Sequence, residues 1–194
     1  MQKKISSLFW ALLLAAGVGL TCRTAVAADE YAYDNVHSSI GFKARHLDIS
    51  WIHGRFNEAE GKFVLDREHP EKSTFELTIK AASVDTANEK RDEHLRQPDY
   101  FDTKQFPNIT FKSTRVKPID GGFEVTGDFT MHGKTNKVTL KLIGGKEHKF
   151  KDSKRVAFST ELSLKRSDYG FDPAAIGLIG DEALILIDCE GVRP

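Results

Sequence analysis

The chain has 194 residues, with 28 Lys+Arg against 28 Asp+Glu, 40% hydrophobic residues and 29% charged residues. These proportions are typical of globular proteins and exclude the weakly hydrophobic, highly charged class of disordered chains. A formal net charge of zero gives no reason to expect a nucleic-acid partner. Two cysteines are too few for a disulfide framework or a four-thiolate zinc site, and the length favours a single domain.

Residues 1–27 have the three parts of a secretory signal peptide. Two lysines open the segment, an apolar run follows from about residue 8 to 20, and Ala25-Val26-Ala27 supplies an A-x-A cleavage site. The apolar run is too short to span a bilayer. We therefore expect a periplasmic mature domain of residues 28–194, without an integral membrane segment. It would keep one cysteine, Cys189, and a net charge of 25 − 28 = −3.

Alternation of apolar and polar residues dominates the mature chain and is typical of half-buried strands. The alternating runs cover residues 36–45, 59–65, 75–79, 109–111, 123–132, 138–142, 155–164 and 183–192. Glycine-containing turns are expected at 120–122, 132–134 and 144–145. About eight strands joined by short loops predict an all-β fold, an eight-stranded antiparallel β-barrel that closes on itself.

Residues 87–96 interrupt the alternation and predict one short helix. Thr86 and Glu89 fit a capping box, and Pro98 would end the helix. An aromatic loop at 100–107 and a glycine-punctuated segment at 167–180 are the two irregular stretches.

Motifs for metal binding or covalent catalysis are missing from the sequence. The seven histidines form neither H-x-H nor H-E-x-x-H, and there is no G-x-S-x-G. Cys189 lies between Asp188 and Glu190, whose carboxylates would raise the pKa of a thiol. We therefore expect Cys189 to be a buried structural residue, and we expect no metal and no cofactor.

The proposed inward face of the barrel is rich in phenylalanine. The interior of an eight-stranded barrel is wide enough either to be filled by side chains or to hold one small ligand. Composition alone leaves both a filled core and an apolar carrier open.

An ordered series of motifs nevertheless extends over residues 30–192. The series comprises Asp34-x-x-His37-Ser38-x-Ile40-x-Phe42, Gly54-x-Phe56, Gly61-x-Phe63, Arg91-Asp92-x-His94-Leu95, Asp99-Tyr100-Phe101-Asp102, Gly127-Asp128-Phe129-Thr130-Met131-His132-Gly133 and Arg166-Ser167-Asp168-Tyr169-Gly170. It resembles the YceI-like family. The resemblance implies a lipocalin-like barrel with a long interior pocket for a polyisoprenoid chain, such as an isoprenoid quinone or an isoprenyl pyrophosphate. It also implies a periplasmic protein of a family whose members are not established as enzymes.

Alternation selects the residues expected to form the wall of that pocket: Ile40, Phe42, Phe111, Phe123, Phe129, Leu140, Phe158 and Leu162. Arg91 and His94 belong to the helix segment of the resemblance, and two roles are open for them. They either receive the polar head of the ligand at the barrel mouth or hold the helix to the barrel. Trp51 either packs over an opening or joins the core, and the loop at 168–171 is a candidate gate at the opposite end.

These features favour a periplasmic carrier of an amphiphilic isoprenoid lipid, with a homodimer through apolar loops left open. The alternative is an enzyme that acts on a lipid with histidines at the barrel mouth, which predicts converging polar side chains deep in the pocket. A small outer-membrane barrel would need an apolar outer face. The outer faces of the expected strands instead carry charged residues such as Lys43, Arg45, Lys80, Lys141 and Glu161.

Overall fold

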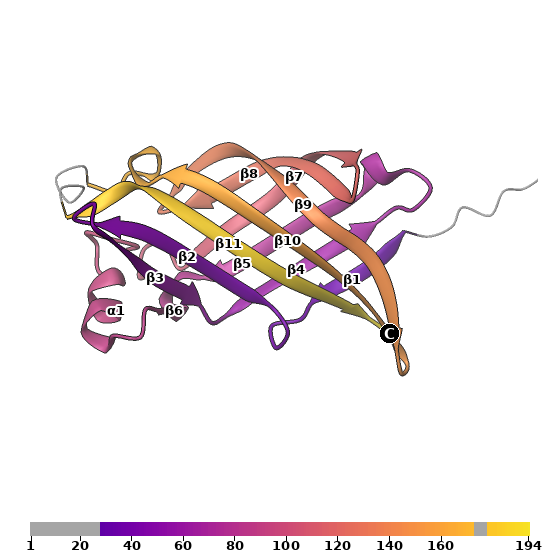
Figure 1. Ribbon diagram of the computed structural model, residues 1–194, viewed down its shortest axis with the longest axis horizontal. Coiled ribbons are helices and arrows are strands. Elements are labelled where there is room, and N and C mark those ends of the chain that lie inside the picture. Colours follow the sequence, from indigo (N-terminus) through magenta and orange to yellow (C-terminus); the bar gives the residue numbers. More distant parts are fainter. Residues whose placement is uncertain (1–27, 173–177) are drawn as a thin grey trace, which may run out of the picture.

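The computed structural model describes residues 28–172 and 178–194 (Figure 1). The expected signal peptide lies outside these residues, so its cleavage stays a prediction. The strands are β1 (Asp29–Tyr33), β2 (Ser39–His46), β3 (Ser50–Phe56), β4 (Ala59–Leu65), β5 (Thr74–Lys80), β6 (Val84–Asp85), β7 (Asn108–Ile119), β8 (Gly122–Met131), β9 (Lys134–Phe150), β10 (Ser153–Lys165) and β11 (Ile179–Arg193). The helix α1 covers Glu89–Leu95, and the short 3-10 helices are η1 (Pro70–Lys72), η2 (Ala81–Ser83) and η3 (Arg166–Tyr169).

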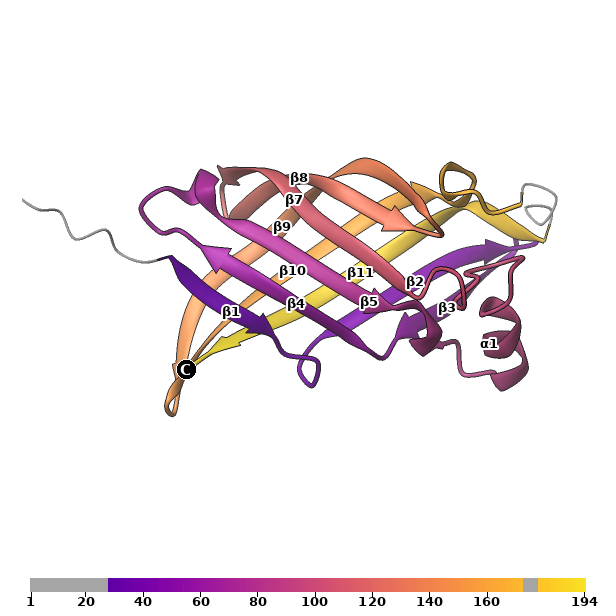
Figure 2. The same ribbon diagram turned by 180° about the vertical axis from the view of Figure 1, so that it is seen from behind.

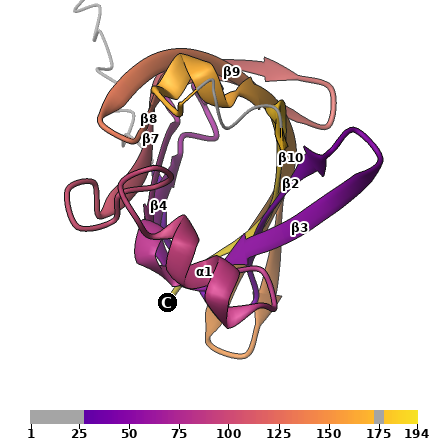
Figure 3. The same ribbon diagram turned by 90° about the vertical axis from the view of Figure 1, so that its left-hand side faces the viewer.

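Eight strands close into an antiparallel barrel. The ring follows β1, β4, β5, β7, β8, β9, β10 and β11, and it closes because β11 also pairs with β1. Beyond its short pairing with β1, β11 pairs with β2. Strand β2 forms a hairpin with β3, and β3 pairs with β6. Figures 1 and 2 show an elongated barrel with tilted strands, and Figure 3 shows β2 and β3 leaning away from the ring at one end. The expected eight-stranded antiparallel barrel with one helix is confirmed.

Alternation places side chains on the two faces of the wall as expected. Along β8, Val125 and Phe129 are buried in the interior. Between them, Asp128 points outward and accepts a 2.8 Å hydrogen bond from Lys137 on β9. The outer face of this wall is therefore polar.

One strand lies outside the expected runs, and one expected turn is wrong. Residues 50–56 form β3, in register with β2 from His46 opposite Ser50 to Ile40 opposite Phe56. Gly144 and Gly145 do not make a hairpin turn. They adopt left-handed φ angles of 132° and 90° inside β9, where the register with β10 shifts, so they bend a strand that continues to Phe150.

Helix α1 lies across one end of the barrel, away from the end where the chain terminates (Figures 1 and 3). Its N-cap is Asn88, whose side chain accepts a 3.0 Å hydrogen bond from the backbone N–H of Arg91. The expected Thr86 cap is therefore wrong. The Thr86 hydroxyl instead donates to the buried carboxylate of Asp92 at 2.5 Å.

The part of the interior farther from α1 is packed with aromatic rings. Phe158 makes edge-to-face contacts with Phe63 and Phe75, at centroid distances of 6.0 and 5.4 Å, and Phe123 packs against Phe75 at 5.7 Å. Tyr31 is completely buried nearby, with Gly191 between it and Phe63. In the described part of the chain, no helix has the length and apolar character needed to cross a membrane.

Candidate functional site

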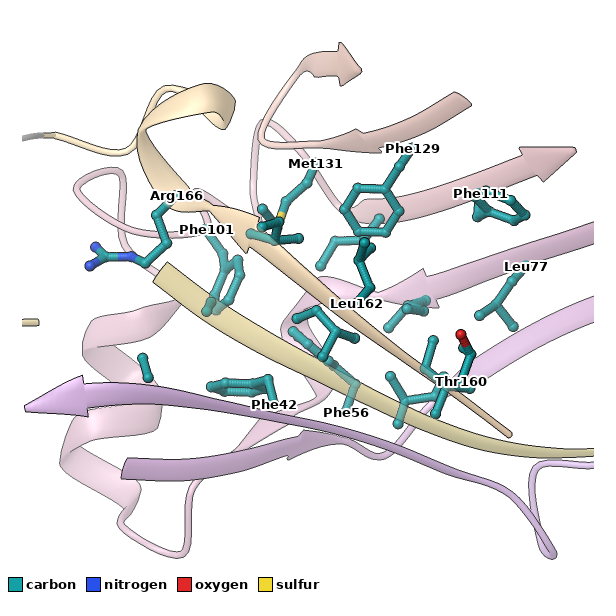
Figure 4. Close-up of a pocket in the computed structure, with 18 of the residues that line it drawn as sticks. Phe42, Phe56, Leu77, Phe101, Phe111, Phe129, Met131, Thr160, Leu162 and Arg166 are labelled. Atoms are coloured by element: carbon teal, nitrogen blue, oxygen red, sulfur yellow. The ribbon is translucent and has the colours of Figure 1, made fainter. Parts of the chain in front are cut away.

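An apolar cavity extends from the aromatic cluster to α1. Its volume is about 190 Å³ when measured as space open to the centre of a water molecule. A single water needs only about 10–15 Å³ by this measure, so the barrel is hollow and its core is not filled. Figure 4 shows Phe42, Phe56 and Leu162 around this space, with Arg166 at the α1 end and Leu77 and Thr160 farther inside.

Two glycines explain how a phenylalanine-rich wall leaves room. A Cβ atom at Gly54 would stand 2.2 Å from the ring of Phe42, its partner across β2 and β3. A Cβ atom at Gly127 would stand 2.5 Å from the ring of Phe111 on the neighbouring strand. Because these positions lack side chains, each ring lies against the backbone instead of projecting into the lumen.

Nine of the ten residues expected at the site line the cavity: Ile40, Phe42, Phe111, Phe129, Leu140, Phe158, Leu162, Arg91 and His94. Phe123 is not among the lining residues. Its ring packs against Phe75 and Phe158 in the aromatic cluster instead. Alternation identified the inward face correctly but gave no information on height along the barrel axis.

Arg91 is hydrogen-bonded to the segment that leads into α1. Its Nε donates to the Thr86 hydroxyl and its Nη2 to the Thr86 carbonyl, both at 2.7 Å. His94 contacts Asp99 at 2.7 Å, and its ring meets Tyr100 edge to face. These contacts hold α1 and its following loop in place. Because both side chains also line the cavity, a second role toward a ligand is compatible with them.

Phe101, from the loop after α1, lies at the centre of an aromatic group at the mouth. Its ring meets Phe56 at 5.5 Å and Phe171 at 5.6 Å, both edge to face. Arg96 holds the base of this loop by donating to the carbonyls of Ala82 and Val84. The segment 168–171 was expected to gate the opposite end, but Phe171 lies beside Phe101, so the segment belongs to the α1 end.

Arg166 is a site residue that the sequence analysis missed. It follows β10 in η3, lines the cavity and is only 7% exposed. Its Nη1 donates to the carbonyls of Ile179 and Gly180 at 3.0 and 3.2 Å, and its guanidinium lies 5.4 Å from the Phe171 ring centre. Its Nη2 is buried without a hydrogen-bond partner in the described chain.

The electrostatic surroundings of Arg166 favour a hydrogen bond from its guanidinium to an oxygen acceptor of a ligand. Burial lowers the pKa of its guanidinium, while nearby Tyr100 and Asp181 act in the opposite direction. Asp181 itself is hydrogen-bonded to Ser167 and forms no ion pair with Arg166 among the described residues. A buried cation without an anionic partner is costly, and a ligand that brings an acceptor would offset this cost.

Two further polar groups lie in the wall formed by β10 and β11. The hydroxyl of Thr160 is buried and has no hydrogen-bond partner in the described chain. Cys189 lines the cavity, and its thiol donates to the Phe158 carbonyl at 3.4 Å. Burial raises the pKa of this thiol to about 12, so Cys189 is not an activated nucleophile.

Converging histidines, which a lipid-processing enzyme was expected to carry, are not assembled in the described part of this cavity. His94 is the one histidine in the lining. His132 packs between Phe106 and Phe171, at 4.9 and 5.1 Å.

A charged cluster lies outside the cavity at Asp34, His37 and Glu190. One ligand atom from each residue falls within 4.8 Å of the others, a spacing that a metal ion could use. The Nη1 atom of Arg155, however, donates to the carboxylates of both Asp34 and Glu190. The guanidinium therefore supplies the positive charge, and we interpret the cluster as a structural ion-pair network that joins β10, β11 and the loop after β1.

The chain matches known sequences along nearly its whole length. Residues 31–191 match the YceI-like domain model. A UPF0312 protein of Photorhabdus laumondii is 38% identical over 184 residues, which cover 93% of this chain and 95% of that protein. Protein YceI of Escherichia coli is 36% identical over 198 residues, with 100% and 99% coverage.

Solved structures share the barrel. The Campylobacter jejuni YCEI protein has a TM-score of 0.69 and 33% identity, covering 83% of this chain and 96% of its own. Burkholderia cenocepacia BcnA (TM-score 0.72, 22% identity, 84% and 99% coverage) and a polyisoprenoid-binding domain from Saccharophagus degradans (0.65, 17%, 84% and 98%) are similar in fold. On the family model and the sequence identities together, the chain belongs to the YceI-like family.

Proposed function

We propose that this protein binds one long-chain isoprenoid lipid in the barrel cavity and carries it through the periplasm. The observation that carries the proposal is a hollow, apolar barrel interior with the basic side chains of its lining at one end. Arg91, His94 and Arg166 belong to the α1 end, whereas the wall beyond them is built mainly from Phe, Leu and Ile side chains.

The cavity suits a chain with an apolar tail and one polar head. Each buried CH₂ group contributes roughly 0.8 kcal/mol, so a prenyl tail gains affinity from its length without polar contacts. The head would lie at the α1 end, where the Nη2 of Arg166, which has no partner among the described residues, offers a hydrogen bond. A quinone carbonyl and a prenyl phosphate both provide an acceptor, and the phosphate also neutralises the charge.

The likeness to other proteins supports the same ligand class. The Saccharophagus degradans domain, with the same barrel fold, is described as polyisoprenoid-binding. Binding is favoured over catalysis because the lining residues with reactive side chains are committed elsewhere: His94 contacts Asp99, and the pKa of Cys189 is raised to about 12 by burial.

Native mass spectrometry of the protein purified from its own host tests the proposal. We expect a co-purifying mass that matches one isoprenoid lipid and that disappears in a Leu162→Trp variant, whose indole would occupy the lumen. Ser163→Ala, at the next position but outside the cavity lining, is the matched control and should keep the lipid. A folded wild-type protein with no bound mass, and no uptake of added farnesol or farnesyl phosphate, would overturn the proposal.

The periplasmic part of the proposal has its own test. Cell fractionation should recover the protein with the periplasmic fraction, and N-terminal sequencing should begin at Ala28. Recovery in the cytoplasm with residue 1 intact would contradict it.

A further inference from the structure

The β2–β3 hairpin at the cavity mouth exposes an unusual set of large apolar side chains. Leu47, Ile49, Trp51 and Leu178 are 48%, 78%, 44% and 62% exposed. Leu178 belongs to the same surface, because its carbonyl accepts a 2.9 Å hydrogen bond from the N–H of Leu47. We call these four residues the apolar tip. Two roles were expected for Trp51, packing over the opening or joining the core, and its exposed position fits neither.

The turn of the hairpin holds a leucine in an unfavourable backbone conformation. Leu47 and Asp48 both adopt left-handed φ angles, 53° and 57°. Asn-Gly is the favoured sequence for a turn with two positive φ angles, and a leucine in such a turn carries a conformational cost. The chain nevertheless holds an exposed leucine at this position. Such a costly arrangement of exposed apolar residues indicates an interaction surface.

The apolar tip is flanked by positive charge. The Nζ atom of Lys43 and the Cζ atom of Arg45 lie 4.9 and 5.0 Å from the ring centre of Trp51. Residues 39–56 carry three basic side chains against one acidic side chain, Asp48, a formal charge of +2 in a mature chain of −3. The hairpin is therefore cationic within an anionic protein.

The apolar tip adjoins the cavity. Ala44 and Ile52, on the same two strands, line the cavity with their inward side chains. Figure 3 shows the hairpin leaning away from the ring at the end that α1 crosses. A surface that touched the apolar tip would therefore face the end of the barrel where Arg166 and Phe101 lie.

We propose that the apolar tip and its two flanking cations, Lys43 and Arg45, dock the barrel mouth onto an anionic lipid bilayer. A tryptophan with neighbouring basic side chains is the combination that the headgroup region favours, because the ring is amphipathic and the cations meet lipid phosphates. Docking in this orientation presents the cavity mouth to the membrane. The inference rests on the proposed function in one respect: lipid exchange is the purpose that we give to docking. Docking itself can be measured without a bound lipid.

Vesicle binding tests the proposal. In the expected mature chain from Ala28 onward, Trp51 is the only tryptophan, so its emission reports directly on the hairpin. We expect the protein to sediment with phosphatidylcholine vesicles that contain phosphatidylglycerol, and Trp51 emission to shift to shorter wavelength. Binding should weaken at high salt and on vesicles of phosphatidylcholine alone, because exposed charges are screened.

Variants identify the surface. Ile49→Ser should weaken binding about tenfold through lost apolar burial. Lys43→Gln should weaken it about fivefold through the lost attraction to anionic lipid. The matched control is Phe150→Ser on the β9–β10 hairpin. The Phe150 ring is 50% exposed with Lys151 over it, and Phe150 does not line the cavity. This control should bind as the wild type does.

Three results would overturn the proposal. The first is no binding to the anionic vesicles, and the second is a loss in Phe150→Ser equal to that in Ile49→Ser. The third is a concentration-dependent Trp51 shift without vesicles, together with a dimer in sedimentation that Ile49→Ser abolishes, because the tip would then cover a second copy of the chain. Uptake of farnesyl phosphate by the same preparations, measured separately, distinguishes failed docking from failed lipid binding.

Discussion

The ring of Phe42 lies against the bare backbone of Gly54, so closely that a Cβ atom at Gly54 would stand 2.2 Å from the ring's Cζ atom. The two residues face each other across β2 and β3. The size of the cavity therefore depends on a residue that contributes no side chain to it. The ring of Phe111 approaches the backbone of Gly127 almost as closely, although Gly127 is paired with Ser113 in the register.

Gly54→Ala should reduce lipid uptake. The added methyl group displaces the Phe42 ring from the wall, and overpacking of this kind costs roughly 1–3 kcal/mol. We expect a lower melting temperature and a smaller bound fraction of a prenyl lipid, measured by differential scanning calorimetry and native mass spectrometry. Gly41→Ala is the control, since its nearest neighbours would be 3.7 and 3.8 Å away. Equal behaviour of the two variants would contradict the role of Gly54.

Arg166→Gln should weaken the binding of farnesyl phosphate more than that of farnesol. A hydrogen bond to a charged group contributes roughly 1.5–3 kcal/mol, so the expected loss for the phosphate is about tenfold to a hundredfold. Farnesol has the same tail and no anionic head, so its affinity should change little. Isothermal titration of both ligands measures the difference. Equal losses for the two would mean that Arg166 supports the mouth structurally and does not recognise the head.

The fold was predictable because strand alternation and turn glycines act locally. The cavity wall followed from the same pattern, which is why seven of the eight residues chosen by alternation line it. Alternation could not locate Phe123 along the barrel axis, since a period of two encodes the face and not the height. It also could not distinguish glycines in turns from Gly144 and Gly145, which bend β9.

Arg166 escaped prediction for a different reason. An arginine in a polar-looking loop is normally exposed, and only the tertiary packing of η3 against Phe171, Ile179 and Gly180 buries it. The single available signal was its place at the start of the motif Arg166-Ser167-Asp168-Tyr169-Gly170. Sequence alone gives that motif no position relative to α1, so the loop was assigned to the wrong end.

Acid should destabilise the fold through Asp34. Burial raises the pKa of its carboxyl, but hydrogen bonds from His37, Val36 and Arg155 outweigh burial and bring the pKa to about 2. Because this folded pKa lies below the unfolded value of 3.8, the stabilisation is present above about pH 4 and is lost as the pH falls toward 2. Glu147, whose pKa is also about 2, adds a contribution of the same sign.

Asp34→Asn should therefore lower the melting temperature at pH 7 and flatten its dependence on pH between 4 and 2, leaving the contribution of Glu147. Thermal unfolding followed by circular dichroism across that range measures both effects. Glu161→Gln removes an exposed carboxylate from the strand that carries Arg155 and serves as the control. An unchanged slope in Asp34→Asn would contradict the assignment.

Cys189 should be almost unreactive in the folded protein. With a pKa of about 12, roughly one thiol in ten thousand is ionised at pH 8, and only the thiolate attacks alkylating reagents. The rate of reaction with iodoacetamide should rise about tenfold per pH unit up to pH 11, whereas an ordinary thiol would reach a plateau near pH 9. Saturation with farnesyl phosphate should slow the reaction further, because the thiol lies in the cavity wall. Urea-unfolded protein gives the reference rate, and Cys189→Ser gives the blank. A plateau near pH 9 in the folded protein would show that the thiol is not buried as described.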